Sequence, residues 1–451
     1  MNELNDTKRF LEFVGRCPDL LDPRNGQIVI ARAPGRLDLM GGIADYSGSL
    51  VLEYPISLAA YAAIQRSVQR RVEITSILPN ASLHFEASLD ELLEHDYESA
   101  REWFRKVNSR RWASYVAGAF IVLNRERGVR FENGAKILIR SEVPEGKGVS
   151  SSAALEVSSM QAIIAAFGVE ISPVEIALLC QKVENLIAGA PCGVMDQLTS
   201  ACGEQDKLLE LLCRPAELLG TLSLPEDLGI WGIDSGVRHS IGAADYGTVR
   251  TAAFIGLRMI ESMGLSKIAY LTEIPPDEFR RQYAWRLPRH ISGEDFLRDF
   301  GQTRDNVTRV EQRKYPVFEA TRHPIDEHAR VVRFRQILGE FSGTVDNRDS
   351  SRTSAAEELG ELMCQSHASY SACGLGSPGT DKIVELVCEM GPPRGLFGAK
   401  ITGGGSGGTV AVLGRSDAGD AVKEVAERYA KGTTVISGSS PGAAAFGVRY
   451  L

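Results

Sequence analysis

Several common sequence patterns are missing from this chain of 451 residues. Its eight cysteines include no C-x-x-C pair, which argues against a zinc site or a secreted disulfide framework, so we expect mostly core thiols. No long run of Lys and Arg occurs and the formal net charge is -8, so no nucleic acid partner is expected. No apolar stretch is long enough to span a membrane, and the polar start Met1 to Arg9 has no signal-peptide core. We therefore expect a cytoplasmic protein with no membrane partner.

The remaining composition indicates an ordinary globular protein with an α+β fold. A hydrophobic content of 43% and a charged content of 24% suffice for a large core, and the length favours two domains. Apolar spacing predicts helices at 7–16, 88–125, 151–167, 172–189, 194–202 and 416–430, with a mostly helical, charged region at 247–340. Strands are predicted at 27–33, 136–140, 208–213, 230–234, 400–402, 409–413 and 445–450, the first of them ending in a Pro34-Gly35 turn. This order favours an α+β sandwich over a doubly wound sheet.

The segment from Val143 to Ala154 is the strongest local signal, because it reads as a phosphate-binding loop that runs from a strand into a helix. Gly146 and Gly148 let the backbone approach an anion closely. The serines at 150–152 can cap the following helix, whose free amides face a phosphate, and a serine at this place can also hold Mg²⁺. An ordinary capped helix after a glycine-rich turn is the alternative interpretation.

Two better-known nucleotide motifs do not fit. The segment 143–154, called the serine loop below, is not a Walker A motif, because Gly148 stands where that motif requires Ser or Thr. Residues 374–379 and 403–408 match G-x-G-x-x-G by letter, but a strand follows the second where a dinucleotide site needs a helix. The first follows a polar segment without strand character, so neither a P-loop NTPase nor a Rossmann domain is predicted.

Three segments together resemble the three motifs of the GHMP small-molecule kinases, in the same order: residues 33–46, the serine loop, and 400–408. Residues 180–197, and 237–240 with Tyr246, look specifically like the galactokinase branch. The resemblance implies the two-domain GHMP kinase fold, with a ribosomal protein S5 domain 2-like N-terminal domain and a ferredoxin-like C-terminal domain. We place the domains at 1–205 and 206–451, with a helical insert at about 260–320.

The resemblance also implies roles for single residues, with ATP and Mg²⁺ as cofactors. Asp196 matches the catalytic carboxylate that takes a proton from the anomeric hydroxyl of a sugar, and Arg36 matches the arginine beside it. Ser152 and Glu184 match the two Mg²⁺ ligands, whose hard oxygens suit that ion. A helix cap, a surface arginine and a solvated glutamate are the alternatives for Asp196, Arg36 and Glu184.

The implied binding sites are larger than this catalytic set. The nucleotide is expected to contact Gly146, Gly148, Ser150, Ser151, Ser152 and, next to the adenine, Trp112. The sugar is expected to contact Arg36, Gly42, Ile43, Asp45, Gly193, Asp196, Tyr246, Gly404 and Gly405. A core aromatic is nearly as good an interpretation of Trp112. We assign His239 and His367 no catalytic role, because a lone His is more often structural.

One departure from the galactokinase pattern points to the substrate. Galactokinases usually carry Glu-His where this chain has Gly42 and Ile43, and those two side chains engage the 6-hydroxyl end of the sugar. β-L-Arabinopyranose has the ring stereochemistry of α-D-galactopyranose but lacks the exocyclic CH₂OH, so it needs no polar partner there. The segments 33–52, 194–202, 232–240 and 398–408 also resemble the kinase domain of plant L-arabinokinases. We therefore expect an L-arabinose 1-kinase with residual galactose activity, since such a site discriminates by roughly a hundredfold at most.

Two other functions stay open at this point. A galactokinase could bind the 6-hydroxyl with other residues, and a non-catalytic sensor of sugar and ATP could share the fold without the catalytic set. A uronic acid substrate is disfavoured, because the motif contains no new Arg or Lys to pair with its carboxylate. The expected partners are the small-molecule sugar and ATP, and the sequence leaves monomer and dimer open.

Overall fold

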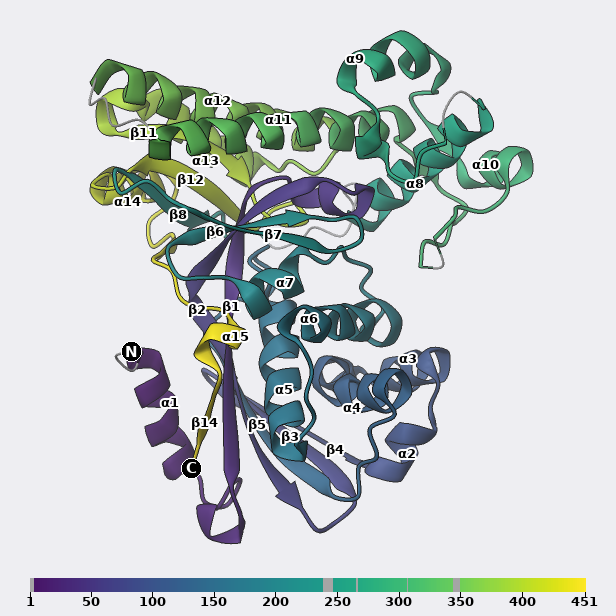
Figure 1. The fold of residues 1–451 in the computed structure, drawn as a ribbon, viewed down its shortest axis with the longest axis vertical. Coiled ribbons are helices and arrows are strands. Elements are labelled where there is room, and N and C mark those ends of the chain that lie inside the picture. Colours follow the sequence, from purple (N-terminus) through teal and green to yellow (C-terminus); the bar gives the residue numbers. More distant parts are fainter. Residues whose placement is uncertain (1–3, 238–245, 265–266, 306, 344–348) are drawn as a thin grey trace.

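The computed structural model describes residues 4–237, 246–264, 267–305, 307–343 and 349–451, and its largest element is a mixed sheet of eight strands. The central order is β14-β1-β2-β5-β3-β4 (Figure 1). In addition, β6 pairs with the first residues of β2, and β7 pairs with β6. The strands are β1 (Ile28–Met40), β2 (Leu50–Ser67), β3 (Arg71–Leu78), β4 (Ala81–Ser88), β5 (Gly134–Ser141), β6 (Lys207–Leu212), β7 (Glu217–Ser223) and β14 (Val448–Tyr450).

Helices cover both faces of this sheet, because alternate residues of its strands are apolar on both sides. Val29 and Ala31 of β1 belong to the main core under the helices, whereas Ile28 and Ile30 pack with α1 (Asn5–Gly15) on the other face. The helical layer over the main core is formed by α2 (Leu89–Glu94), α3 (Tyr97–Lys106), α4 (Ser114–Arg127), α5 (Ser151–Phe167), α6 (Pro173–Lys182), the π-helical turn Val183–Ala188, α7 (Met195–Cys202) and the short α15 (Ala443–Phe446).

A second, antiparallel sheet has the order β11-β12-β8-β13 and lies across the end of the first (Figure 1). Its strands are β8 (Leu228–Asp234), β11 (Leu396–Ile401), β12 (Thr409–Arg415) and β13 (Val435–Ser437). One face packs against α13 (Pro378–Met390) and α14 (Gly419–Tyr429), and the other against α11 (Val317–Gly343) and α12 (Asp349–Ala372). The remaining part, built on α8 (Tyr246–Ser262), α9 (Pro276–Glu278), α10 (Gly293–Phe300) and the short strands β9 (Ile291–Ser292) and β10 (Lys314–Tyr315), projects to one side (Figure 1).

The α+β prediction is confirmed, but three predicted strands have wrong bounds. The strand predicted at 400–402 is β11, which begins earlier, at Leu396, and ends at Ile401. The first strand does not turn at Pro34-Gly35: β1 continues to Met40, with a register shift between Pro34 and Arg36. Gly35 serves a close approach instead, since a Cβ there would lie 2.5 Å from the Val149 carbonyl oxygen. The final strand covers only 448–450, because 443–446 form α15.

The division of the sheets also bears on the predicted domains. A boundary at residue 205 assigns β6 and β7 to the second domain, yet both strands join the eight-stranded sheet through β2. The chain passes to the second sheet between β7 and β8, and β14 returns to the first. The domain boundary at residue 205 stays a prediction. The strand pairing favours a boundary nearer residue 224, after β7.

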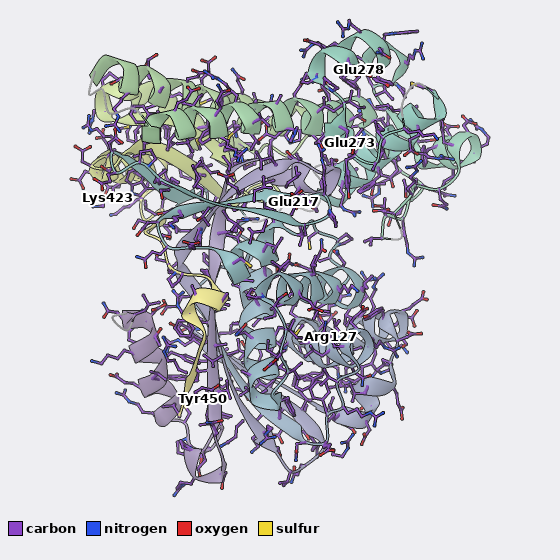
Figure 2. The ribbon with its side chains drawn as sticks, in the orientation of Figure 1. Arg127, Glu217, Glu273, Glu278, Lys423 and Tyr450 are labelled. Carbon is purple, nitrogen blue, oxygen red and sulfur yellow. The ribbon has the colours of Figure 1, made fainter. Side chains whose placement is uncertain are left out.

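The surface carries charges of both signs on many elements. Exposed Arg127, Glu217, Glu273 and Lys423 point outward from different parts of the fold (Figure 2). Within the ranges that the structure describes, no helix is long and apolar enough to cross a membrane.

A buried ion pair joins the two sheets at residues 33–46, the segment that is called the sugar motif from here on. Lys400 of β11 contacts the Asp38 carboxylate of β1, and neither side chain is exposed. The Asp38 amide donates to Thr402 Oγ1 at 2.7 Å, which fixes the same two strands to each other. Because both charges are out of water, each depends on the other.

We predict that Lys400→Met destabilises the protein by about 3–5 kcal/mol, because it leaves the Asp38 carboxylate buried without its cation. Urea unfolding of the variant measures this loss. The double variant Lys400→Met with Asp38→Asn should recover part of the stability. A single variant as stable as the parent would show that the pair does not hold the sheets together.

Candidate active site

Arg36 and Asp196 form a close ion pair where three of the predicted motifs meet. Nε and Nη2 of Arg36 donate to Asp196 Oδ1 at 3.0 and 2.7 Å, and Nη1 donates to the Gly148 carbonyl oxygen at 2.6 Å. The Arg36 side chain is 2% exposed and that of Asp196 is 20% exposed. Asp196 is therefore the accessible end of the pair, and it lies in the first turn of α7.

A second carboxylate, Glu53 of β2, lies behind Arg36 at 3.2 Å from Nε and is completely buried. Burial by itself disfavours the Arg36 cation, but the charges of Asp196, Glu53 and Asp38 outweigh it and raise its pKa. Burial and the charge of Asp38 raise the pKa of Glu53 well above its usual value. Sequence analysis missed Glu53, although a glutamate inside the apolar stretch 50–54 was an available signal.

Asp45 lies in the turn after β1, where Gly193 makes room for it. A Cβ at Gly193 would overlap the Asp45 carboxylate, so only glycine permits this approach. Asp45 accepts the Tyr46 amide at 2.6 Å. Burial, followed by the charge of Asp196, raises the pKa of Asp45 to about 7. The groups facing it are Asp196, Arg36, Arg250, Tyr46 and Tyr246.

The serine loop forms an open cradle at the start of α5. Gly146 and Gly148 have φ values of +68° and +70°, and a Cβ at Gly148 would lie 2.8 Å from the Thr402 carbonyl oxygen. Ser150 precedes the helix but does not cap it, contrary to our expectation, and its buried Oγ has no hydrogen-bond partner. The first amides of α5 thus have no side-chain cap, which suits an anionic ligand.

Ser152 and Glu184, the two predicted Mg²⁺ ligands, lie close together, since the Ser152 side chain acts to lower the pKa of Glu184. Gln197 Nε2 donates to Glu184 Oε2 at 2.6 Å and to Glu156 Oε2 at 3.2 Å. Burial and the charge of Asp196 raise the pKa of Glu184 to about 7, and Glu156 keeps a buried oxygen without a partner. A divalent cation would stabilise the buried Glu184 carboxylate and would offer a positive charge to the Glu156 oxygen that lacks a partner. These residues therefore fit Mg²⁺.

The described residues alone do not supply a complete metal shell. Among the residues that the structure describes, no group of three or more His, Cys, Asp and Glu side chains could hold a metal ion. Mg²⁺ commonly completes its octahedron with phosphate oxygens and water. Sequence analysis missed Glu156, whose signal was that it is the one charged residue in the sequence of helix 151–167.

Trp112 lines a pocket of about 220 Å³ together with Phe104, Arg105, Tyr115 and Ile187. Its indole Nε1 is buried without a hydrogen-bond partner. Tyr115 is close enough to Glu184 and Glu156 for their charges to contribute to its raised pKa, after burial. The pocket therefore lies beside the predicted metal site and is of a size that suits a planar heterocycle.

The glycine-rich loop, residues 403–408 after β11, contains the predicted sugar-binding residues Gly404 and Gly405 and lies against Tyr246. Gly404 lies against the Tyr246 ring, since a Cβ there would be 3.5 Å from Tyr246 Cδ2. Gly405 adopts φ +77° and packs against Leu375. Tyr246 contacts the edge of Tyr46 with ring centres 5.9 Å apart. His239 lies outside the described residues.

His367 has a structural partner rather than a place in this site. Its Nε2 lies 3.1 Å from Asp381 Oδ1, and its side chain is only 10% exposed. Burial lowers the pKa of His367.

Gly42 and Ile43 lie beside Tyr370, a residue of α12 that sequence analysis did not identify. Tyr370 Oη accepts the Ile43 amide at 2.8 Å and donates to the Gly403 carbonyl oxygen at 3.2 Å. Gly42 adopts φ +43°, and a Cβ there would overlap the Tyr370 hydroxyl. The Ile43 side chain is 1% exposed and packs in one apolar cluster with Tyr46 and Tyr370. No side chain fits at position 42 while Tyr370 is in place.

Comparison with known families agrees with this geometry. The galactokinase galactose-binding signature matches residues 23–66, the GHMP kinase N-terminal domain matches 114–204, and the GHMP kinase C-terminal domain matches 348–432. These ranges hold Arg36, Ser152, Asp196 and the glycine-rich loop. The chain belongs to the GHMP kinases, which confirms the predicted family and fold.

Individual relatives refine this placement. Over 93% of its length the chain is 43% identical to the L-arabinokinase of Arabidopsis thaliana, and it spans 46% of that protein, about half. It is 29% identical to the galactokinase of Actinobacillus succinogenes over 89% of both chains. The structure of Lactococcus lactis galactokinase complexed with galactose matches with a TM-score of 0.76 at 20% identity, covering 96% of this chain and 99% of that one. At that identity the match supports the fold.

The raised pKa of Asp45 predicts a pH-dependent stability. Its pKa is about 7 in the folded protein against 3.8 for an ordinary Asp, so the proton-bound form favours folding, and this contribution is lost as the pH rises from about 4 through 7. Asp45→Asn should therefore raise Tm at pH 8, and by less at pH 5. Asp420→Asn, at a carboxylate that is 97% exposed, is the control and should show no such difference.

Proposed function

We propose that this chain transfers the γ-phosphoryl group of ATP to the anomeric hydroxyl of a sugar, with L-arabinose as the preferred acceptor. The observation that carries the proposal is the Arg36–Asp196 pair, which joins the sugar motif, the serine loop and α7 within 3.0 Å. A carboxylate with one accessible end beside a buried guanidinium suits proton abstraction from a hydroxyl. The GHMP kinases to which the chain belongs are phosphotransferases.

The proposed mechanism assigns each part of the site one task. Asp196 accepts the proton of the anomeric hydroxyl, and Arg36 stabilises the negative charge that develops on that oxygen. The amides of 146–152 bind the nucleotide phosphates, and Trp112 packs against the adenine. Ser152 and Glu184 would hold Mg²⁺, which supplies charge neutralisation on the phosphates when bound. Asp45, with Gly193 and Tyr246, orients the sugar ring.

The preference for a pentose rests on the arrangement around Gly42. Where galactokinases present Glu-His to the 6-hydroxyl end, this chain has Gly42 and Ile43, and the Tyr370 hydroxyl fills the space that a side chain at 42 would need. A sugar without an exocyclic CH₂OH leaves no hydroxyl unpaired at such an end. The relative named L-arabinokinase, 43% identical, supports the same substrate.

A galactokinase is the alternative function, and relatives so named at 29% identity favour it. A non-catalytic sensor is less well supported. Such a sensor has no need of the carboxylate, the arginine and the proposed metal-binding pair, whereas this chain has Asp196 bonded to Arg36, and Ser152 near Glu184.

The first test is ADP release with ATP and Mg²⁺ across L-arabinose, D-galactose, D-galacturonate and D-glucuronate, each against a control without sugar. We expect L-arabinose to give the highest kcat/KM, with residual activity on galactose. Galactose giving the highest value would support the alternative, and no release with any sugar would favour the sensor.

The contribution of Gly42 requires a combined variant. Gly42→Glu with Ile43→His collides with Tyr370, so we predict that this pair alone misfolds or loses activity. Adding Tyr370→Ala gives the introduced glutamate room, and the kcat/KM ratio of galactose to arabinose should then rise above that of Tyr370→Ala alone. An unchanged ratio would show that this end of the site does not select the sugar.

Asp196→Asn tests the proton acceptor. The amide keeps the shape of the side chain but cannot take a proton, so kcat should fall by about 10²–10⁴. Sugar binding, followed by calorimetry without turnover, should change little. Full activity would remove Asp196 from the mechanism.

A further inference from the structure

A second pocket, of about 290 Å³, lies beside the candidate active site and is lined by five arginines. Arg101 and Arg105 come from α3, Arg250 from α8, and Arg309 and Arg313 from the segment before β10. Among the described residues that line the pocket, Glu311 is the one carboxylate, and it pairs with Arg313 at 2.7 Å. The lining therefore has a strong positive excess that nothing in the proposed reaction uses.

The arginines differ in how well their charges are balanced. Arg250 is 7% exposed and pairs with Asp305 at 2.9 Å, yet its buried Nε has no partner. Arg101 donates to the backbone carbonyls of Leu186 and Asn185 at 2.9 and 3.0 Å, and neither of these groups carries a charge.

Arg105 and Arg309 add to the imbalance. Among the described residues, no carboxylate forms an ion pair with Arg101, Arg105 or Arg309. Burial and then the charges of Arg105 and Arg309 lower the pKa of Arg101, so each of these two cations repels Arg101 across the pocket.

We propose that this pocket binds a small molecule through a phosphate group. Guanidinium groups match phosphate oxygens with paired, charge-assisted hydrogen bonds, and a doubly charged anion would supply the negative charge that Arg101, Arg105 and Arg309 lack in this pocket. The volume exceeds that of a phosphate ion, so it also holds a compact body such as one sugar ring.

The position of the pocket connects it to both halves of the candidate active site. Arg105 also lines the pocket of Trp112, and the carbonyls that Arg101 binds directly follow Glu184 in the chain. Arg250 lies over the ring of Tyr46, 5.9 Å from its centre. A bound phosphate thus ties α3, on the nucleotide side, to α8, on the sugar side. An effect on catalysis rests on the proposed function, whereas binding does not.

Binding is tested by calorimetry with inorganic phosphate and, separately, with a sugar 1-phosphate. The nucleotide and sugar sites are first filled with a non-hydrolysable ATP analogue, Mg²⁺ and L-arabinose. We expect one phosphate to bind to the parent protein and Arg309→Glu to weaken this binding by about tenfold or more. Arg281→Glu makes the same charge change at an exposed residue of the same region that does not line the pocket, and should bind as the parent does.

Two further measurements separate binding from folding. Without phosphate, Arg309→Glu should raise Tm, because the new carboxylate pairs with Arg101 and Arg105. Arg309→Gln removes the cation without introducing a negative charge, and it should also weaken phosphate binding. Tighter binding of the sugar 1-phosphate than of phosphate would identify a phosphosugar as the ligand. No binding to the parent, or equal binding to the parent and Arg309→Glu, would overturn the proposal whether or not the protein is a sugar kinase.

Discussion

The buried charge of Arg36 is the constraint on which the site depends. One guanidinium donates hydrogen bonds to Asp196 of α7 and to the carbonyl of Gly148 in the serine loop, and it forms an ion pair with Glu53 of β2, while its own backbone lies in β1. A cation so far from water is stable only with its carboxylates in place, and those carboxylates are stable only with the cation. The folding of the two sheet strands, the helix and the loop is thereby coupled to the geometry of the proposed reacting groups.

Carboxylates outnumber cationic side chains in this site, and the excess negative charge lies where the ligands are proposed to bind. Asp45 and Glu184 both have pKa values raised to about 7 by burial and by Asp196, and Glu156 keeps a buried oxygen without a partner. Such a cluster costs stability in the empty protein. The sugar hydroxyls near Asp45 and a divalent cation near Glu184 would each offset part of that cost, so the strain is concentrated where ligands are proposed to bind.

The sequence predicted the parts of the site that are local in the chain. Gly146, Gly148 and Ser152 follow from a strand, a turn and a helix within twenty residues, and the family resemblance supplied Arg36, Asp196 and Glu184. Glu53, Glu156 and Tyr370 were missed because their roles depend on contacts with distant segments. The length of β1 was missed for the same reason, since Gly35 looks like a turn residue until Val149 packs against it.

Tyr370 shows why a substitution in a sugar motif cannot be interpreted from the motif alone. Gly42 reads as the loss of a polar group, but the space it leaves is filled by a tyrosine 328 positions further along the chain, from the helical layer of the second sheet. The hydroxyl of Tyr370 bonds the amide of Ile43 and the carbonyl of Gly403, so it fixes both the sugar motif and the glycine-rich loop. The motif and α12 therefore constrain each other, because a side chain at position 42 and the Tyr370 hydroxyl would occupy the same space. The substrate preference proposed for this chain accordingly depends on the contact of α12, which packs on the second sheet, with the sugar motif. It does not depend on Gly42 and Ile43 alone.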